Sequence, residues 1–247
     1  MTQRNLKSII VALILMSIGS ILAPVDAYVW KSPSALLVSI GCSLLASGLV
    51  LLLTTLLIDY DKPNPVDDWK LSVIYETRAE KTKANDPKLD KARHQVDAIA
   101  FGLSNFRSRH GNKVEPFLRR GVNFRIITMN PDSSFVAQRE REENQVSGAI
   151  KHSIEDLVSW ADRINQNKYK GKIIIKGYNC MTLDFYWRVD NMIYVGPYFY
   201  DEPSNQTITY GFEEGGKGFA RYSDYFEKLW DNKDLTVELT KKTLGRR

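Results

Sequence analysis

The chain has 247 residues, with 34 Lys and Arg against 29 Asp and Glu and a formal net charge of +5. Two cysteines are too few for a disulfide-held secreted scaffold, and three scattered histidines do not supply the clustered ligands of a metal site. We therefore expect no disulfide framework, no metal and no cofactor. Beyond residue 58 the chain is only mildly basic, which does not by itself require a nucleic acid as partner.

Two apolar stretches, residues 8–23 and 34–58, contain no ionisable side chain. A helix needs about 20 apolar residues to cross the hydrocarbon core, so the second stretch is long enough and the first is short. Leu6 and the stem of Lys7 extend the first stretch at the membrane edge. We predict a two-transmembrane hairpin over residues 1–58. The alternative is a cleaved signal peptide over 1–27, because Val25-Asp26-Ala27 loosely fits a cleavage site.

The distribution of basic residues predicts the orientation. Arg4 and Lys7 precede the first apolar stretch, and Lys62, Lys70 and Arg78 follow the second. The positive-inside rule then places both the N-terminus and the large C-terminal domain in the cytoplasm.

Small residues four apart, Ser39, Ser43 and Ser47, run along the second stretch. Small side chains at this spacing allow close helix approach in lipid, either against the first stretch or against another copy of the chain. Because neither stretch carries a charge, a pump or proton relay is not expected. An anchor, or a pore made by oligomerisation, fits this pattern.

A polar, proline-broken linker is expected at 59–68, a domain at 69–235 and a polar basic tail at 236–247. In the domain, short β-type runs alternate with helical periodicity, which predicts an α/β sandwich. The expected strands are 71–75, 96–103, 122–129, 172–178, 181–190 and 192–196. The expected helical segments are the end of a helix at 88–94, then 112–120 closed by Gly121, a long helix over 146–164, and a final helix over 219–230.

Polar residues follow the expected strand 122–129, at the end where α/β sheets place ligands. Asp132 with Ser133 and Ser134 also fits a plain helix N-cap. The run at 139–143 (REREE) is most simply a solvated helix face. Strand 181–190 alternates strictly, with Phe185 on its apolar face and with Arg188 and Asp190 on its polar face, where they either bind a ligand or pair with each other. The candidate ligand-binding residues are Asn130, Asp132, Ser134, Arg139, Arg188 and Asp190.

Two segments carry a family resemblance. FLRRGVNFRIITMNPDSS (117–134) and LDFYWRVDNMIYVG (183–196) resemble units of phospholipase D-like domains, and the likeness covers roughly residues 70–231. It is closest to a bacterial subgroup that lacks the catalytic His-x-Lys-x4-Asp motif. With Asp190 as the motif aspartate, Leu183 and Phe185 stand at the His and Lys positions, and neither can act as a nucleophile or bind phosphate. The resemblance thus implies a mixed sheet with flanking helices, no catalytic residues, and a homodimer, since half-domains of this family commonly build one site from two copies.

The hairpin joined to such a domain resembles the two-transmembrane effectors of retron-type anti-phage systems. That resemblance implies a signal-gated effector of the bacterial inner membrane that acts by abortive infection. The partners it implies are the lipid bilayer, further copies of the chain, and an inhibitory protein, a reverse transcriptase–nucleic acid complex or a nucleotide signal. Two alternatives remain open: a membrane-anchored divergent phosphodiesterase or nuclease that uses His110 or His152, and a passive membrane-anchored sensor.

Overall fold

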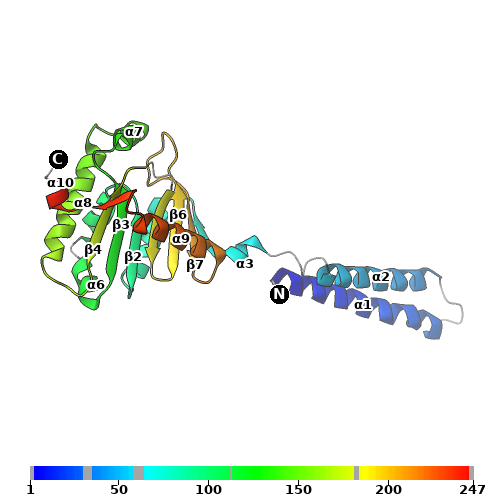
Figure 1. Ribbon diagram of the computed structural model, residues 1–247. Helices are drawn as coiled ribbons and strands as arrows, with labels where there is room; N and C mark the ends of the chain where they lie inside the picture. The colour runs from blue at the N-terminus through cyan, green and yellow to red at the C-terminus, as the bar shows by residue number, and fades with distance from the viewer. Residues whose placement is uncertain (1–2, 30–34, 58–63, 112, 181–183, 245–247) are drawn as a thin grey trace. The chain divides into compact units, whose positions relative to one another are not determined.

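The computed structural model describes residues 3–29, 35–57, 64–111, 113–180 and 184–244 (Figure 1). The chain divides into two compact units, Met1–Pro65 and Val66–Arg247.

The first unit is built from two helices, α1 (Gln3–Val29) and α2 (Ala35–Leu57), which lie side by side. They run antiparallel, because Gly19 meets the backbone of Gly41 whereas Gly48 meets that of Ala12. A Cβ at Gly19 would lie 2.7 Å from the Gly41 carbonyl oxygen, so glycine is what permits this approach. The buried contact residues recur every seventh position, as in left-handed helix pairs. They are Ala12 and Gly19 on α1, and Gly41, Gly48 and Thr55 on α2.

Within the described residues, one helix is long and apolar enough to cross a membrane: Leu37–Leu57, 21 residues with a mean hydropathy of 2.2. The apolar part of α1, Leu6–Leu22, is shorter. Ser39, Ser43 and Ser47 are exposed on α2, away from the buried glycines. These serines are therefore not among the buried residues of the α1–α2 contact, and their self-association stays a prediction.

The second unit is an α/β domain with one eight-stranded mixed sheet, in the order β1-β7-β6-β5-β2-β3-β4-β8. The three strands β2, β3 and β4 are parallel and the remaining pairings are antiparallel. The α/β prediction is confirmed. The strands are β1 (Leu71–Tyr75), β2 (Gln95–Ile99), β3 (Asn123–Met129), β4 (Ile173–Tyr178), β5 (Asp184–Val189), β6 (Met192–Pro197), β7 (Thr209–Glu213) and β8 (Thr236–Glu238). The helices are α3 (Pro65–Trp69), α4 (Arg78–Leu89), α5 (Ser104–His110), α6 (Val114–Arg120), α7 (Ser134–Glu142), α8 (Ala149–Asn165), α9 (Lys217–Asp231) and α10 (Lys241–Leu244).

Both faces of the sheet are covered. The larger core packs α5, α6 and α8 on one face, and the expected periodicity of α8 supplies Ile154, Leu157 and Val158 to it. On the opposite face α9 lies across the strands (Figure 1) and buries Phe219 and Phe226. Strand β5 serves both layers, because Phe185, Trp187 and Val189 belong to the first core and Tyr186 to the second. The predicted alternation is present over 184–189, and residues 181–183 lie outside the described part.

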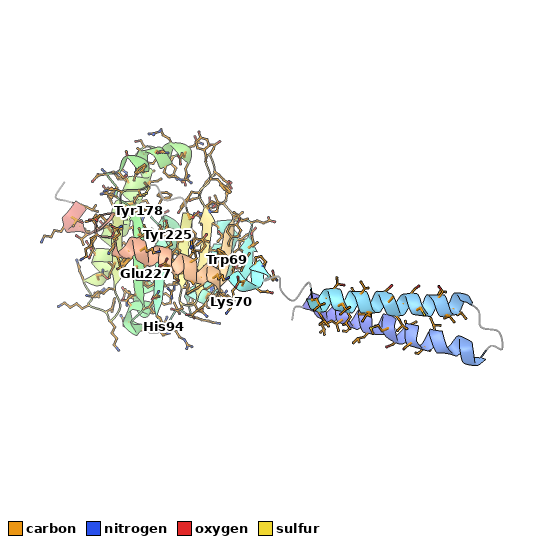
Figure 2. The ribbon with its side chains drawn as sticks, turned by 45° about the vertical axis from the view of Figure 1, so that its right-hand side comes forward. Trp69, Lys70, His94, Tyr178, Tyr225 and Glu227 are labelled. Atoms are coloured by element: carbon orange, nitrogen blue, oxygen red, sulfur yellow. The ribbon has the colours of Figure 1, made fainter. Side chains whose placement is uncertain are left out.

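A partly buried ion cluster ties α9 to the sheet. Arg125 on β3 donates two hydrogen bonds to Asp97 on β2, at 2.7 and 2.9 Å, and two to Glu227 on α9, at 2.8 and 2.6 Å (Figure 2 labels Glu227). Asp97 is fully buried. Because a planar guanidinium satisfies both carboxylates at once, the cluster fixes α9 over the centre of the sheet.

Several element boundaries differ from the prediction. Helix α4 ends at Leu89, so only the first two residues of the expected 88–94 segment are helical, and β2 ends at Ile99 rather than 103. The chain leaves β2 early because Gly102 packs against Ser153, where a Cβ would lie 2.0 Å from the Ser153 Oγ, and Leu103 then adopts a φ of 50° at the start of α5. Residues 65–68 of the expected linker belong to α3.

The prediction of a polar tail over 236–247 is wrong for its first residues. Residues 236–238 form β8, which pairs with the β4 edge, and the next residue, Leu239, is 3% exposed. Leu239 packs over Gly177, where a Cβ would lie 2.8 Å from a Leu239 methyl carbon. The strand covers backbone groups that an open edge would leave unpaired.

The run at 139–143 is not a solvated face, which corrects a second expectation. Arg139 and Glu140 are 2% and 3% exposed. The Glu140 carboxylate accepts hydrogen bonds from the backbone N–H groups of Gly148 and Ile150, at 2.8 and 2.9 Å, at the start of α8. Gly148, with a φ of 88°, offers no side-chain cap there, so Glu140 of α7 caps α8 from outside the helix.

We expect Glu140→Ala to lower the free energy of unfolding by about 1–3 kcal/mol, because it leaves buried N–H donors unsatisfied. Urea unfolding of the full chain in a non-ionic detergent, followed by tryptophan fluorescence, measures this change. The control is Glu80→Ala at an exposed position of α4, which should stay within about 0.5 kcal/mol of the parent. Equal effects of the two substitutions would contradict the capping role.

Candidate functional site

A cavity of about 580 Å³ lies at the end of the sheet where β2 finishes. The register places the first residues of β5 and the last residues of β6 at this same end, because Ile99 pairs with Tyr186 and Phe185 pairs with Gly196. Segment 100–106 forms one wall, and α4 and the start of α8 contribute the others. The volume is within the range of small-molecule sites.

Two cations of α4, Arg78 and Lys81, line the cavity and are themselves 8% and 4% exposed. Both sit over aromatic rings. The Arg78 guanidinium carbon lies 4.2 Å from the centre of the Phe185 ring and 4.7 Å from that of Tyr198. The Lys81 ammonium lies within about 5 Å of three ring centres, those of Phe185, Trp187 and Tyr194. Ring faces attract cations, which offsets part of the cost of burying these charges.

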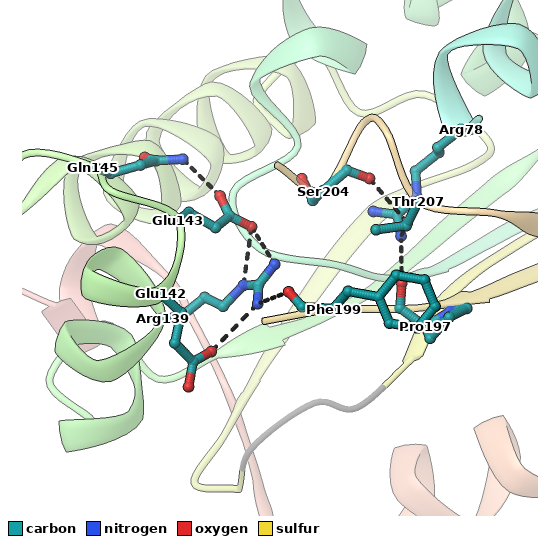
Figure 3. A network of polar contacts seen from close by, with 9 residues as sticks. All are labelled: Arg78, Arg139, Glu142, Glu143, Gln145, Pro197, Phe199, Ser204 and Thr207. Atoms are coloured by element: carbon teal, nitrogen blue, oxygen red, sulfur yellow. Dashed lines mark hydrogen bonds and ion pairs between the residues drawn. The ribbon is translucent and has the colours of Figure 1, made fainter. Parts of the chain in front are cut away.

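Arg78 is held in place by neutral acceptors (Figure 3). Its Nη2 donates to the Thr207 hydroxyl at 2.8 Å and to the Pro197 carbonyl at 3.4 Å, while its buried Nε has no hydrogen-bond partner. Burial lowers the pKa of the Arg78 guanidinium, and the Tyr198 hydroxyl beside it opposes that shift. A buried guanidinium with a spare donor is ready to bind an anion.

A second network closes the wall opposite α4 (Figure 3). Arg139 donates to Glu143 at 2.6 and 2.9 Å, to Glu142 at 3.3 Å and to the Phe199 carbonyl at 3.1 Å. Asn144 donates to Asp201 at 2.8 Å. These bonds join the end of α7 to the segment after β6.

The charge of the cavity is positive. Arg78, Lys81 and Arg109 line it. Among the described lining residues Glu143 is the one carboxylate, and Arg139 pairs with it. Phe101, Phe106, Phe185, Trp187 and Tyr198 supply ring faces. This arrangement favours a ligand that carries a negative charge and a planar ring.

The six candidate residues from the sequence fall at two opposite ends of the sheet, and none of them lines the cavity. Asn130, Asp132, Ser134 and Arg139 follow β3 at its carboxyl end. Asp132 pairs with Lys151 at 2.8 Å, and Ser133 caps α7, which confirms the N-cap alternative for Ser133 but not for Asp132 or Ser134.

Arg188 and Asp190 lie beside the start of β2. They do not form an ion pair with each other. The Arg188 Nε donates to the backbone carbonyl of Asp190 at 2.8 Å, and the Asp190 carboxylate accepts from the N–H groups of Arg93, His94 and Gln95. Asp190, at a φ of 47°, thereby fixes the β5–β6 turn against β2.

At the position where the phospholipase D-like pattern has its lysine, Phe185 lies beneath Arg78. The other motif position, Leu183, falls outside the described residues. No sequence pattern pointed to Arg78 and Lys81, because two cations three residues apart on a polar helix resemble a solvated face. Of the histidines, His110 lines the cavity, while His94 and His152 are exposed. In the described part of the chain, no three His, Cys, Asp or Glu residues are grouped as metal ligands.

No protein-family model matches the chain, and no curated protein matches it. Two solved structures are similar in fold. TrmBL2, an archaeal chromatin protein that binds DNA, aligns at 12% identity and a TM-score of 0.39, over 78% of this chain and 62% of its own. NucT from Helicobacter pylori aligns at 10% identity and a TM-score of 0.42, over 68% of this chain and 98% of its own. This chain thus spans about 62% of the length of TrmBL2.

The Asp190 carboxylate should stabilise the fold in a pH-dependent way. Burial raises its pKa, but the three backbone donors outweigh burial and hold the pKa below its ordinary value. A lowered pKa contributes stability above the unfolded value of about 3.9, and that contribution is lost as the pH falls through the folded pKa. Asp190→Asn should therefore lower the urea midpoint clearly at pH 7 and much less near pH 3. Exposed Asp234→Asn is the control, and a pH-independent effect of Asp190→Asn would refute the assignment.

Proposed function

We propose that the chain is a membrane effector gated by an anionic ligand, which binds in the cavity lined by Arg78 and Lys81. The observation that carries this proposal is the pair of buried cations facing a cavity whose one described carboxylate is already paired. The same chain carries a helix long and apolar enough to cross a bilayer. Binding and membrane attachment are thus joined in one polypeptide.

The apolar helices fit an output role. Helix α1 meets α2 through small residues, so the two form a compact pair, and Ser39, Ser43 and Ser47 remain exposed for contact with another copy. Neither apolar stretch carries an ionisable residue, which favours assembly in the membrane over transport along a charged path. On this proposal both helices span the inner membrane and the α/β domain is cytoplasmic.

The resemblance to phospholipase D-like domains without the catalytic motif extends the proposal. Phe185 replaces a phosphate-binding lysine, and Arg78 with Lys81 brings positive charge to the same place from α4. A former catalytic site of this kind retains anion binding while it lacks a nucleophile. The resemblance to retron-type effectors adds phage defence as the setting, with further copies of the chain and an inhibitory partner as its associates.

A ligand gates such a protein by binding two conformations with different affinity. We infer that those conformations differ in the wall formed by the end of α7 and the segment after β6, which Arg139 and Asn144 join by hydrogen bonds. Glu143 and Gln145 line the cavity from the first segment, and Ser204 and Asn205 line it from the second. A ligand that contacts both sides favours the closed arrangement.

We expect the full chain in detergent to bind AMP at least about tenfold more tightly than adenosine or ribose 5-phosphate, since charge and ring contacts each contribute roughly 1–2 kcal/mol. Trp187 lines the cavity, so fluorescence titration reports binding. Arg109→Gln at the rim should weaken AMP binding about tenfold. The matched control is Arg163→Gln, exposed and outside this cavity. Equal affinity for all three compounds, or equal effects of the two variants, would exclude this ligand class.

Membrane action is tested in cells. Induced expression of the full chain should depolarise bacteria, read with a potential-sensitive dye, and removal of residues 1–58 should abolish the effect. Ser43→Phe should reduce depolarisation and detergent-resistant oligomers, because a bulky ring blocks the exposed small face. Ser17→Phe, also exposed but on α1, is the control. Undiminished toxicity of the truncated chain would overturn the proposal.

Two further experiments on the same chain distinguish the effector from the two alternatives, a passive anchored sensor and an enzyme. A passive anchored sensor keeps its function when residues 1–58 are replaced by an unrelated two-span anchor, whereas the effector loses it. An enzyme is favoured by one observation, the presence of His110 in the cavity. It predicts cleavage of a model phosphodiester that His110→Ala abolishes, and absence of cleavage by the full chain removes it.

A further inference from the structure

At the end of the sheet opposite the cavity, β2, β3 and β4 begin. This end is formed by the three segments that lead into these parallel strands: 90–94, 119–123 and 166–172. They lie side by side. The Asn123 N–H donates to the His94 carbonyl at 3.2 Å, and the Gly171 N–H donates to the Leu118 carbonyl at 2.9 Å. Figure 1 shows α6 at this edge, at the end of the sheet away from α7, and Figure 2 labels His94 there. We call these three segments the basic edge.

The basic edge concentrates positive charge. It carries seven exposed lysines and arginines against one carboxylate, Asp90. The edge therefore has a net charge of +6, more than the +5 of the whole chain, so the remainder of the protein is close to neutral. The seven residues are Lys91, Arg93, Arg119, Arg120, Lys168, Lys170 and Lys172.

Nearby carboxylates do little to offset this charge. Asp190 is held by backbone N–H groups, and Glu115 accepts from the Tyr169 hydroxyl and meets only Arg119, at 3.7 Å. Within the residues that the structure describes, the edge lysines form no ion pair. A cluster of uncompensated cations is costly through self-repulsion, unless an anionic partner is nearby.

We propose that the basic edge docks on the anionic lipid surface of the membrane that holds α2. Eight residues lie between Leu57 and Val66, a reach of at most about 30 Å, so on this proposal the domain stays close to the bilayer and meets it at a high effective concentration. Clustered cations beside a membrane helix are attracted to anionic headgroups over about a Debye length.

The chemistry of the edge favours lipid over nucleic acid. Four of the seven cations are lysines, flexible point charges that suit mobile headgroups. The edge has no exposed Phe, Tyr or Trp side chain on which a base could stack, since Tyr169 is half-buried and bonded to Glu115; its one exposed aromatic ring is that of His94. The inference rests on α2 being in the bilayer, as proposed above, and not on the ligand of the cavity.

The test uses the full chain in nanodiscs of phosphatidylcholine alone or with about one-third phosphatidylglycerol. Lysine side chains are acetylated briefly and the modified sites are quantified by mass spectrometry. We expect the reactivity of Lys91, Lys168, Lys170 and Lys172 to fall at least about threefold in the anionic discs, and to recover in about 1 M salt, where the Debye length is near 3 Å. Lys228 and Lys233, exposed near α9, should stay unchanged.

Charge-reversal variants provide the control. Lys168→Glu/Lys170→Glu/Lys172→Glu should remove the protection of Lys91, whereas Arg221→Glu/Lys228→Glu/Lys233→Glu, the same charge change elsewhere, should leave it. Equal reactivity in both lipids overturns the inference, and so does protection by an added oligonucleotide in neutral discs without protection by anionic lipid. A chain that fails to co-purify with the discs overturns the membrane anchor and this inference together, so the two failures are told apart.

Discussion

The burial of Arg78 and Lys81 against aromatic rings is the constraint on which the site depends. The described structure gives Arg78 acceptors that are neutral, a hydroxyl and a carbonyl, and gives both cations the faces of rings from β5 and β6. Such contacts offset desolvation only in part. On the proposal above, an anion that enters the cavity recovers part of the desolvation cost of Arg78.

Two other arginines of the domain, Arg125 and Arg139, are paired with carboxylates. Arg125 satisfies Asp97 and Glu227 together, and Arg139 is enclosed by Glu142, Glu143 and a carbonyl. These guanidinium groups are fully paired and hold elements together: α9 to the sheet, and α7 to the segment after β6. The contrast between paired structural arginines and the incompletely bonded Arg78 distinguishes a binding site from scaffold within a single fold.

The two ends of the sheet have separate chemistry. At the carboxyl end of β2, charge is buried, sparse and set among rings, which suits one small ligand. At the amino ends of β2, β3 and β4, charge is exposed and dense, which suits an extended anionic surface. On the two proposals above, a small anionic ligand binds at one end of the sheet and the membrane surface lies at the other.

The sequence by itself determined the apolar character of the first two helices, the α/β class and most element positions, because each depends on local periodicity: the repeat along α8 and the alternation in β5 are examples. It did not determine which charges are buried. Arg139 and Glu140 read as solvent-facing, and Arg78 with Lys81 carried no signal, since burial of a helix face depends on what packs against it. Strand β8 was missed for the same reason: a three-residue segment, Thr236–Glu238, becomes a strand only where the β4 edge is open to receive it. Tertiary packing alone brought α4, β5 and β6 around one cavity and three basic segments onto one edge.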